Sequence, residues 1–236
     1  MAQQLKVRRF EHGALDLQRI EARPVFAGDK IRDLRADERN RAKEIIEDFM
    51  IAANGVTARF LQAKEAPFLR RMVCSPMRWD RIVEVAAESN FKLPAQPDSK
   101  SLERFLVEQK APDPLRFTDL SLTVIKLLGS GEYVVEAPDE ATSGHFGLAV
   151  KDYTHSTAPN RRFPDLITQR ILKAALEGEP LPYSREELTE LARHCTKKEV
   201  DANKVERLVT KSNNKPLLGE ASHDGGSECG HRRRGR

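Results

Sequence analysis

The sequence has no run of apolar residues long enough to cross a membrane, although hydrophobic residues make up 39% of the 236 positions. A membrane-spanning helix needs roughly twenty apolar residues in succession. The first ten residues also lack the apolar core of a signal peptide. The hydrophobic share nevertheless suffices for a real core in one large or two small domains. We therefore expect a protein of the cytoplasm with no membrane contact.

Cysteine is scarce as well. Cys74, Cys195 and Cys229 are odd in number and follow no metal-binding spacing. A disulfide framework requires paired cysteines in an oxidising compartment, so the pattern favours reduced thiols. This agrees with the expected location.

Charge gives only a weak indication, because 40 Lys and Arg residues against 36 Asp and Glu residues leave a net charge of +4. A basic chain suits a polyanionic partner, but many basic proteins bind no nucleic acid. After Ser212 the composition changes to Gly, Ser and polar residues and ends in an arginine-rich stretch. Such a segment cannot bury enough apolar area to order itself. We predict a disordered basic tail over 212–236, either an electrostatic RNA arm or a solvated end without function.

The spacing of apolar residues predicts a helix over residues 37–61 most clearly, because they recur at steps of three and four. Capping residues predict further helix starts at Ser75–Pro76, Ser99, Thr118, Ser184 and Thr196. The last two are followed by Glu187 and Glu199, which complete capping boxes. Strands are expected twice within 10–36 and once at 132–136, and residues 146–150 are expected to form a buried strand or an extended segment. The fold class predicted is α+β, with a few strands packed against several helices.

The most informative segment is 144–170. Its loop, rich in Ser, Thr, Pro and Asn, leads through Arg161 and Arg162 into a predicted helix with Pro164 in its first turn. A helix start offers unpaired N–H groups and partial positive charge, and guanidinium groups match phosphate oxygens. The segment therefore suits a phosphodiester. Considered alone, the arginine pair fits equally an exposed ion-pair cluster with Asp165.

Several motifs together identify a resemblance. Gly-His-Phe-Gly-Leu-Ala at 144–149, followed by Tyr-Thr-His-x-Thr-x-Pro-x-Arg-Arg-Phe-Pro-Asp-Leu at 153–166, closely resembles the signature of the ribonuclease II and ribonuclease R family, the RNB-domain exoribonucleases. Other blocks are similar to family blocks in the family's order: Gly13–Asp16, Ile46–Asn54, Arg71–Pro76 and His194–Arg207. The resemblance runs from about His12 to about Lys211. It implies that residues 1–211 are part of an RNB catalytic domain.

The resemblance implies a function in RNA degradation. Family members hydrolyse single-stranded RNA from the 3′ end to nucleoside 5′-monophosphates, with magnesium held by a cluster of aspartates. The metal activates water and neutralises charge, and an arginine adds fixed positive charge at the phosphate oxygens. By resemblance Arg161 is that catalytic arginine. By the same resemblance Glu47, Arg162 and Glu206 are RNA-binding residues. Asn54, on the same helix face as Glu47, and Tyr153, in the signature loop, are two further candidates for RNA binding.

Simpler interpretations of these residues remain open from the sequence. Glu47 and Glu206 fit solvated helix surfaces, and Asn54 fits a residue that completes a buried contact. Tyr153 fits a core position as well as a platform for a base, on which stacking contributes about 1–3 kcal/mol.

The chain also departs from the family. The family's aspartate cluster precedes the block that begins here at Gly13, and no Asp-x-Asp-Asp arrangement occurs in the sequence. Scattered carboxylates such as Asp16, Asp80, Asp152 and Asp165 have no local metal-binding spacing. Leu17 stands where some relatives have an RNA-clamping aromatic ring. The alternative to an active nuclease is therefore a non-catalytic RNA-binding remnant, or one half of a split enzyme whose second chain carries the aspartates.

Overall fold

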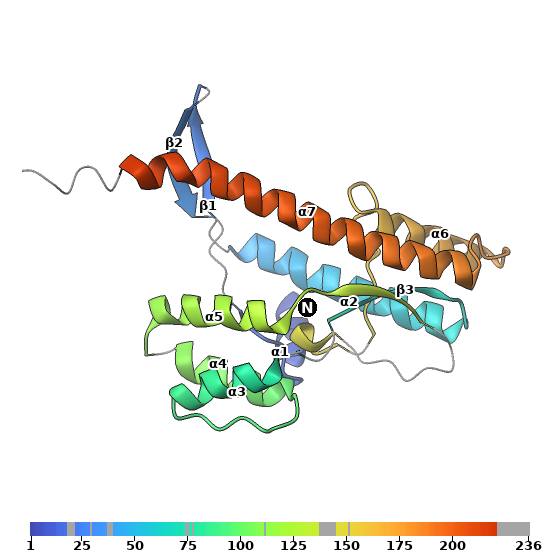
Figure 1. The fold of residues 1–236 in the computed structure, drawn as a ribbon. Helices are drawn as coiled ribbons and strands as arrows, with labels where there is room; N and C mark the ends of the chain where they lie inside the picture. Colours follow the sequence, from blue (N-terminus) through green and yellow to red (C-terminus); the bar gives the residue numbers. More distant parts are fainter. Residues whose placement is uncertain are drawn as a thin grey trace, which may run out of the picture. The chain divides into compact units, whose positions relative to one another are not determined.

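The computed structural model describes residues 1–17, 22–28, 30–36, 40–73, 76, 78–110, 112–136, 145–150 and 152–220. The fold is α+β and rich in helix, as predicted (Figure 1). Its helices are α1 (Ala2–Glu11), α2 (Arg41–Ala63), α3 (Trp79–Glu88), α4 (Ser99–Lys110), α5 (Pro114–Leu128), α6 (Phe163–Glu177) and α7 (Arg185–Glu220). The strands are β1 (Ala22–Ala27), β2 (Lys30–Ala36), β3 (Phe68–Met72) and β4 (Glu132–Glu136). Among the described residues, no helix is both long and apolar enough to span a membrane.

The chain divides into two compact units. The first contains Met1–Arg19 and Arg39–Val200, and the second contains Ile20–Glu38 and Asp201–Arg236. Residues 221–236, including Cys229 and the arginine-rich end, lie outside the described residues, as does Cys74. Helix α7 continues past residue 212, where the composition changes, to Glu220. The predicted ranges 1–211 and 212–236 stay a prediction.

Strands β3 and β4 form the antiparallel pair at the centre of the first unit (Figure 1). Their register aligns Phe68 with Glu136 and Met72 with Glu132. On the other side of β3, the N–H of Arg71 donates to the Tyr153 carbonyl at 2.9 Å. The strand pair therefore fixes the start of the loop that carries the signature motif. Helices α2, α6 and α7 contribute to the core around it, with Ala58, Leu61, Phe68, Leu69, Ile167, Ile171 and Leu188 among its buried residues.

A second core joins α3, α4 and α5. Trp79, Ile82, Leu102, Phe105, Phe117 and Val124 are buried there. The Nε1–H of Trp79 donates to the Pro94 carbonyl at 2.9 Å, so the indole nitrogen stays satisfied although the ring is buried. Leu17, predicted to replace an RNA-clamping ring, packs against this core.

Helix α2 confirms the helix predicted over 37–61, although it begins at Arg41 and ends two residues later than predicted, at Ala63. The side chain of Asn40 caps it by accepting from the Lys43 N–H at 3.0 Å. The second unit contains the hairpin of β1 and β2, which confirms two strands within 10–36, although residues 2–11 form helix α1.

Three local predictions are wrong. Thr118 does not start a helix, because it lies inside α5, whose first turn is capped by Asp113 through a hydrogen bond of 3.1 Å from the Arg116 N–H. Thr196 does not start a helix, because it lies inside α7 and its Oγ1 accepts from the Tyr133 N–H at 2.9 Å, while Glu199 pairs with Arg71. Residues 146–150 are not a buried strand; Phe146–Leu148 form a 3₁₀ turn closed by a bridge between His145 and Val150. The Ser184 capping box is confirmed, since Ser184 and Glu187 exchange hydrogen bonds of 2.8 and 3.2 Å.

Candidate functional site

Arg161 lies at the tip of a tight turn that precedes α6. The N–H groups of Arg161 and Arg162 both donate to the Ala158 carbonyl, at 3.2 and 3.0 Å. The residues at the tip, Pro159, Asn160 and Arg161, are exposed. Within the part of the chain that the structure describes, the guanidinium of Arg161 pairs with no side chain. The turn therefore presents one arginine to the solvent.

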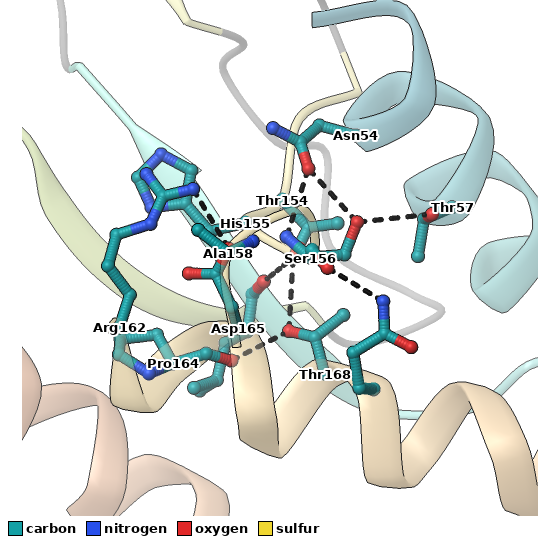
Figure 2. A network of polar contacts seen from close by, with 12 residues as sticks. Asn54, Thr57, Thr154, His155, Ser156, Ala158, Arg162, Pro164, Asp165 and Thr168 are labelled. Atoms are coloured by element: carbon teal, nitrogen blue, oxygen red, sulfur yellow. Dashed lines mark hydrogen bonds and ion pairs between the residues drawn. The ribbon is translucent and has the colours of Figure 1, made fainter. Parts of the chain in front are cut away.

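The buried carboxylate of Asp165 holds this turn by hydrogen bonds. Oδ1 of Asp165 accepts from the Ala158 N–H and from Nη2 of Arg162, both at 2.8 Å (Figure 2). Asp165 is completely buried in the first turn of α6, where it also faces the favourable end of the helix dipole. The two adjacent arginines thus differ, because Arg162 is bound to the scaffold and Arg161 is not.

Asn54 ties the loop to helix α2. Its Oδ1 accepts from the N–H of Ser156 at 2.9 Å and from the Ser156 hydroxyl at 3.0 Å (Figure 2). Its Nδ2 donates to the Tyr153 hydroxyl at 3.2 Å. Asn54 and Tyr153 are both buried. The structure thus gives both residues a part in positioning the loop, and their predicted contact with RNA stays a prediction.

The aromatic and histidine rings beneath the loop form an uncharged layer. Tyr153 meets the rings of His145 and His155 edge to face, with centroids 5.5 and 5.6 Å apart. Burial, followed by the nearby charge of Arg162, lowers the pKa of His155 to about 3. Burial also lowers the pKa of His145 to about 4 and raises that of Tyr133, whose hydroxyl lies 2.8 Å from Nδ1 of His155. At neutral pH none of these rings carries a charge.

Glu47 and Glu206 lie apart from this loop network. Glu47 is partly exposed on α2, and its Oε1 lies 3.7 Å from Nη1 of Arg9. It shares a helix face with Asn54 but is two turns away, roughly 10 Å along the axis. Glu206 is exposed on the part of α7 that belongs to the second unit. For both residues the contact with RNA stays a prediction.

Sequence reasoning missed two ion pairs that brace the site. Arg70 is buried in β3 and donates to Asp152 at 2.9 Å, just before the loop. Arg71 forms a two-pronged pair with Glu199 of α7, both contacts measuring 2.7 Å, and stacks over the ring of Tyr133 at 4.7 Å. Their only signal in the sequence is the Arg-Arg pair beside an apolar segment, which does not identify partners 82 and 128 residues away.

The described carboxylates do not fit a magnesium site. Asp16 pairs with Lys110 at 2.7 Å, Asp152 with Arg70 and Asp165 with Arg162, each on a different element. Among the described residues, no three His, Cys, Asp or Glu side chains are grouped so that they could hold a metal ion. Magnesium prefers several oxygen ligands in octahedral geometry, which separate ion-paired carboxylates do not supply.

Comparison with known proteins identifies the family to which this loop belongs. Residues 1–178 match the family described as RNB domain. Ribonuclease R 1 of Lactococcus lactis is 30% identical over 218 residues, which cover 88% of this chain and 26% of that protein. The chain thus spans about a quarter of the length of this curated relative.

Solved structures share the fold. RNase R of Mycoplasma genitalium, in complex with ribose-methylated single-stranded RNA, has a TM-score of 0.81 at 21% identity, covering 93% of this chain and 35% of that one. Yeast Ssd1, a pseudonuclease, has a TM-score of 0.54 at 23% identity, covering 67% of this chain and 20% of that one. The family match covers most of the sequence and contains the Arg161 turn, the Asp165 clamp and the Asn54 contact. The chain therefore belongs to the RNB domain family.

Proposed function

We propose that this chain is the RNA-binding part of an RNB-type 3′-to-5′ exoribonuclease that acts on single-stranded RNA in the cytoplasm. The observation that carries the proposal is the contrast between the two adjacent arginines. Arg162 is neutralised by the buried Asp165, while Arg161 stands exposed and unpaired among the described residues. A guanidinium beside the start of a helix is an arrangement that phosphate oxygens favour.

The role of Arg161 follows from charge. A phosphodiester gains negative charge on its non-bridging oxygens during hydrolysis, and a guanidinium placed beside those oxygens stabilises that charge. The turn holds Arg161 in place through the Ala158 carbonyl and the Asp165 carboxylate. The uncharged histidines below the loop add no competing acid or base at neutral pH.

Hydrolysis itself needs carboxylates that the described residues do not group together. We therefore propose that the magnesium ligands come from a different polypeptide segment, in the same protein or in a second chain. Nuclease and pseudonuclease structures share this fold, so the fold alone does not decide whether the isolated chain is catalytic. RNA binding without hydrolysis is the activity that the chain's own residues support.

The test follows a 5′-labelled single-stranded RNA oligomer incubated with the purified chain and magnesium. We expect the oligomer to be bound and not shortened, with weaker binding by Arg161→Ala and unchanged binding by Arg104→Ala, an exposed arginine on α4. A ladder that shortens from the 3′ end, and that EDTA abolishes, would show a complete metal site in the chain. Equal binding by both variants would exclude the proposed role of Arg161.

A further inference from the structure

A cleft of about 840 Å³ lies in the first unit. Residues of helices α1 and α2, residues of the segment 145–150 and Asp152 contribute to its lining. Its lining combines the aliphatic residues Leu5, Ile51, Val56, Val73 and Val150 with the charged residues Arg8, Arg9, Arg59, Asp48 and Asp152. His145 and Asp152, which also support the signature loop, contribute to the lining, whereas Arg161 does not.

Some of the polar groups that line the cleft have no hydrogen-bond partner among the described residues. Arg8 and Arg59 are exposed in the lining, and no described side chain pairs with either. Asp48 also lines the cleft and is only 3% exposed. Its Oδ1 accepts from Nη2 of Arg9 at 2.8 Å, but its Oδ2 is buried without a hydrogen-bond partner. A buried carboxylate oxygen without a donor is costly, so the cleft calls for an occupant with an N–H or O–H group.

Three features of the lining specify the occupant. The aliphatic residues favour an apolar side chain, the free arginines favour carboxylates, and Asp48 Oδ2 favours an uncharged donor such as a backbone N–H. An extended polypeptide with alternating acidic and apolar residues supplies all three, because alternate side chains of a strand point to opposite sides.

RNA fits the same cleft less well. Bases bind single-strand sites by stacking on aromatic rings, and among the described residues Phe146 is the only Phe, Tyr or Trp side chain in the lining. That ring is already engaged edge-on with Trp79, at a centroid distance of 6.1 Å.

We propose that this cleft is the docking site of an extended acidic polypeptide segment. The charge pattern sets the orientation of the segment, with its carboxylates at Arg8 and Arg59 and a backbone N–H at Asp48. This proposal does not depend on RNA binding. Arg161 is not among the residues that line the cleft, so either proposal can fail alone.

The chain provides its own reporter for the test. Trp79 is the only tryptophan, and it touches Phe146 at the edge of the cleft. The probe is the dye-labelled peptide Asp-Val-Asp-Val-Asp-Val, blocked at both ends, with Lys-Val-Lys-Val-Lys-Val as its counterpart. We expect saturable binding of the acidic peptide in fluorescence anisotropy, a parallel change in tryptophan emission, and at least tenfold weaker binding of the basic peptide.

Matched variants identify the surface. Val56 lines the cleft and is 57% exposed, whereas Val107 on α4 is 53% exposed and lies outside it. We expect Val56→Asp and Arg59→Glu each to weaken the acidic peptide at least fivefold, and Val107→Asp and Arg104→Glu to leave its affinity unchanged. These side chains are all exposed, so none of the substitutions disturbs the core.

Three outcomes would overturn the proposal. One is the absence of saturable binding, and the second is equal weakening by the cleft variants and their controls. The third is displacement of the peptide by oligoadenylate together with loss of RNA affinity in Arg59→Glu, which would assign the cleft to the RNA. Arg161→Ala separates the two proposals, because we expect it to weaken RNA binding and leave the peptide affinity unchanged.

Discussion

Nη2 of Arg162 donates to Oδ1 of Asp165 at 2.8 Å, and the same carboxylate oxygen accepts from the Ala158 N–H. Since Asp165 is fully buried, this contact fixes the turn on which Arg161 is exposed. The charge of one arginine is thus used for structure, and that of its neighbour is available for a ligand.

Replacing Asp165 by alanine should lower the free energy of unfolding by about 3 kcal/mol, because it leaves Arg162 and the Ala158 N–H without their acceptor. Asp165→Asn retains an oxygen at that position and should cost about 1–2 kcal/mol. Urea denaturation measures both values. Equal losses for the two variants would mean that the acceptor does not hold the turn.

Arg161→Ala should leave the free energy of unfolding within about 0.5 kcal/mol of the parent, because the side chain is exposed and unpaired among the described residues. Its RNA affinity should fall several-fold, and the slope of log K against log salt should become shallower by about 0.7, the effect of one lost phosphate contact. Titrations at several salt concentrations measure the slope. An unchanged slope would argue against a phosphate contact.

Stability should fall as the pH drops below about 6. Burial lowers the pKa of His145 in the folded state to about 4, whereas its ordinary value, expected in the unfolded state, is 6.5. Between pH 6.5 and pH 4 the unfolded state therefore binds a proton that the folded state does not bind, which favours unfolding. The loss from this residue is about 1.4 kcal/mol for each pH unit in that window. His145→Asn, which can still accept from the Leu148 N–H, should reduce the slope by that amount in denaturation measured at pH 6, 5.5, 5 and 4.5. An unchanged slope would show that His145 is accessible to protons.

Gly13→Ala should destabilise the first unit by about 3 kcal/mol. Gly13 has a φ of +91°, and a Cβ atom there would lie 2.9 Å from the backbone nitrogen of Lys100, so strain and overlap add. Gly178 has a φ of +70° with nothing within 4 Å, so Gly178→Ala should cost only about 1–2 kcal/mol. Thermal denaturation compares the two, and equal costs would exclude the clash with α4.

Local patterns predicted those parts of the fold that depend on near neighbours. Helix α2 follows from apolar spacing, and the start of α7 follows from the capping box of Ser184 and Glu187, which the structure confirms. The same pattern at Thr196 misled, because Tyr133 and Arg71 of the strand pair occupy the groups that would have capped a helix. A capping motif does not encode contacts with residues that are distant in the sequence.

The candidate site was also predicted only in part from the sequence. The sequence by itself determined the family, the arginine pair, and the proline and aspartate that start α6, because these lie within one continuous motif. Only the tertiary structure decided which arginine is free, since Asp165 must be buried against the loop to bind Arg162 and not Arg161. It also decided the contact of Asn54 with Ser156, which spans 102 residues, and the unsatisfied Asp48 in the cleft. Long-range packing brings Asn54 to Ser156, which no local spacing encodes, whereas Arg162 and Asp165 are only three residues apart and need the tertiary structure solely for their burial.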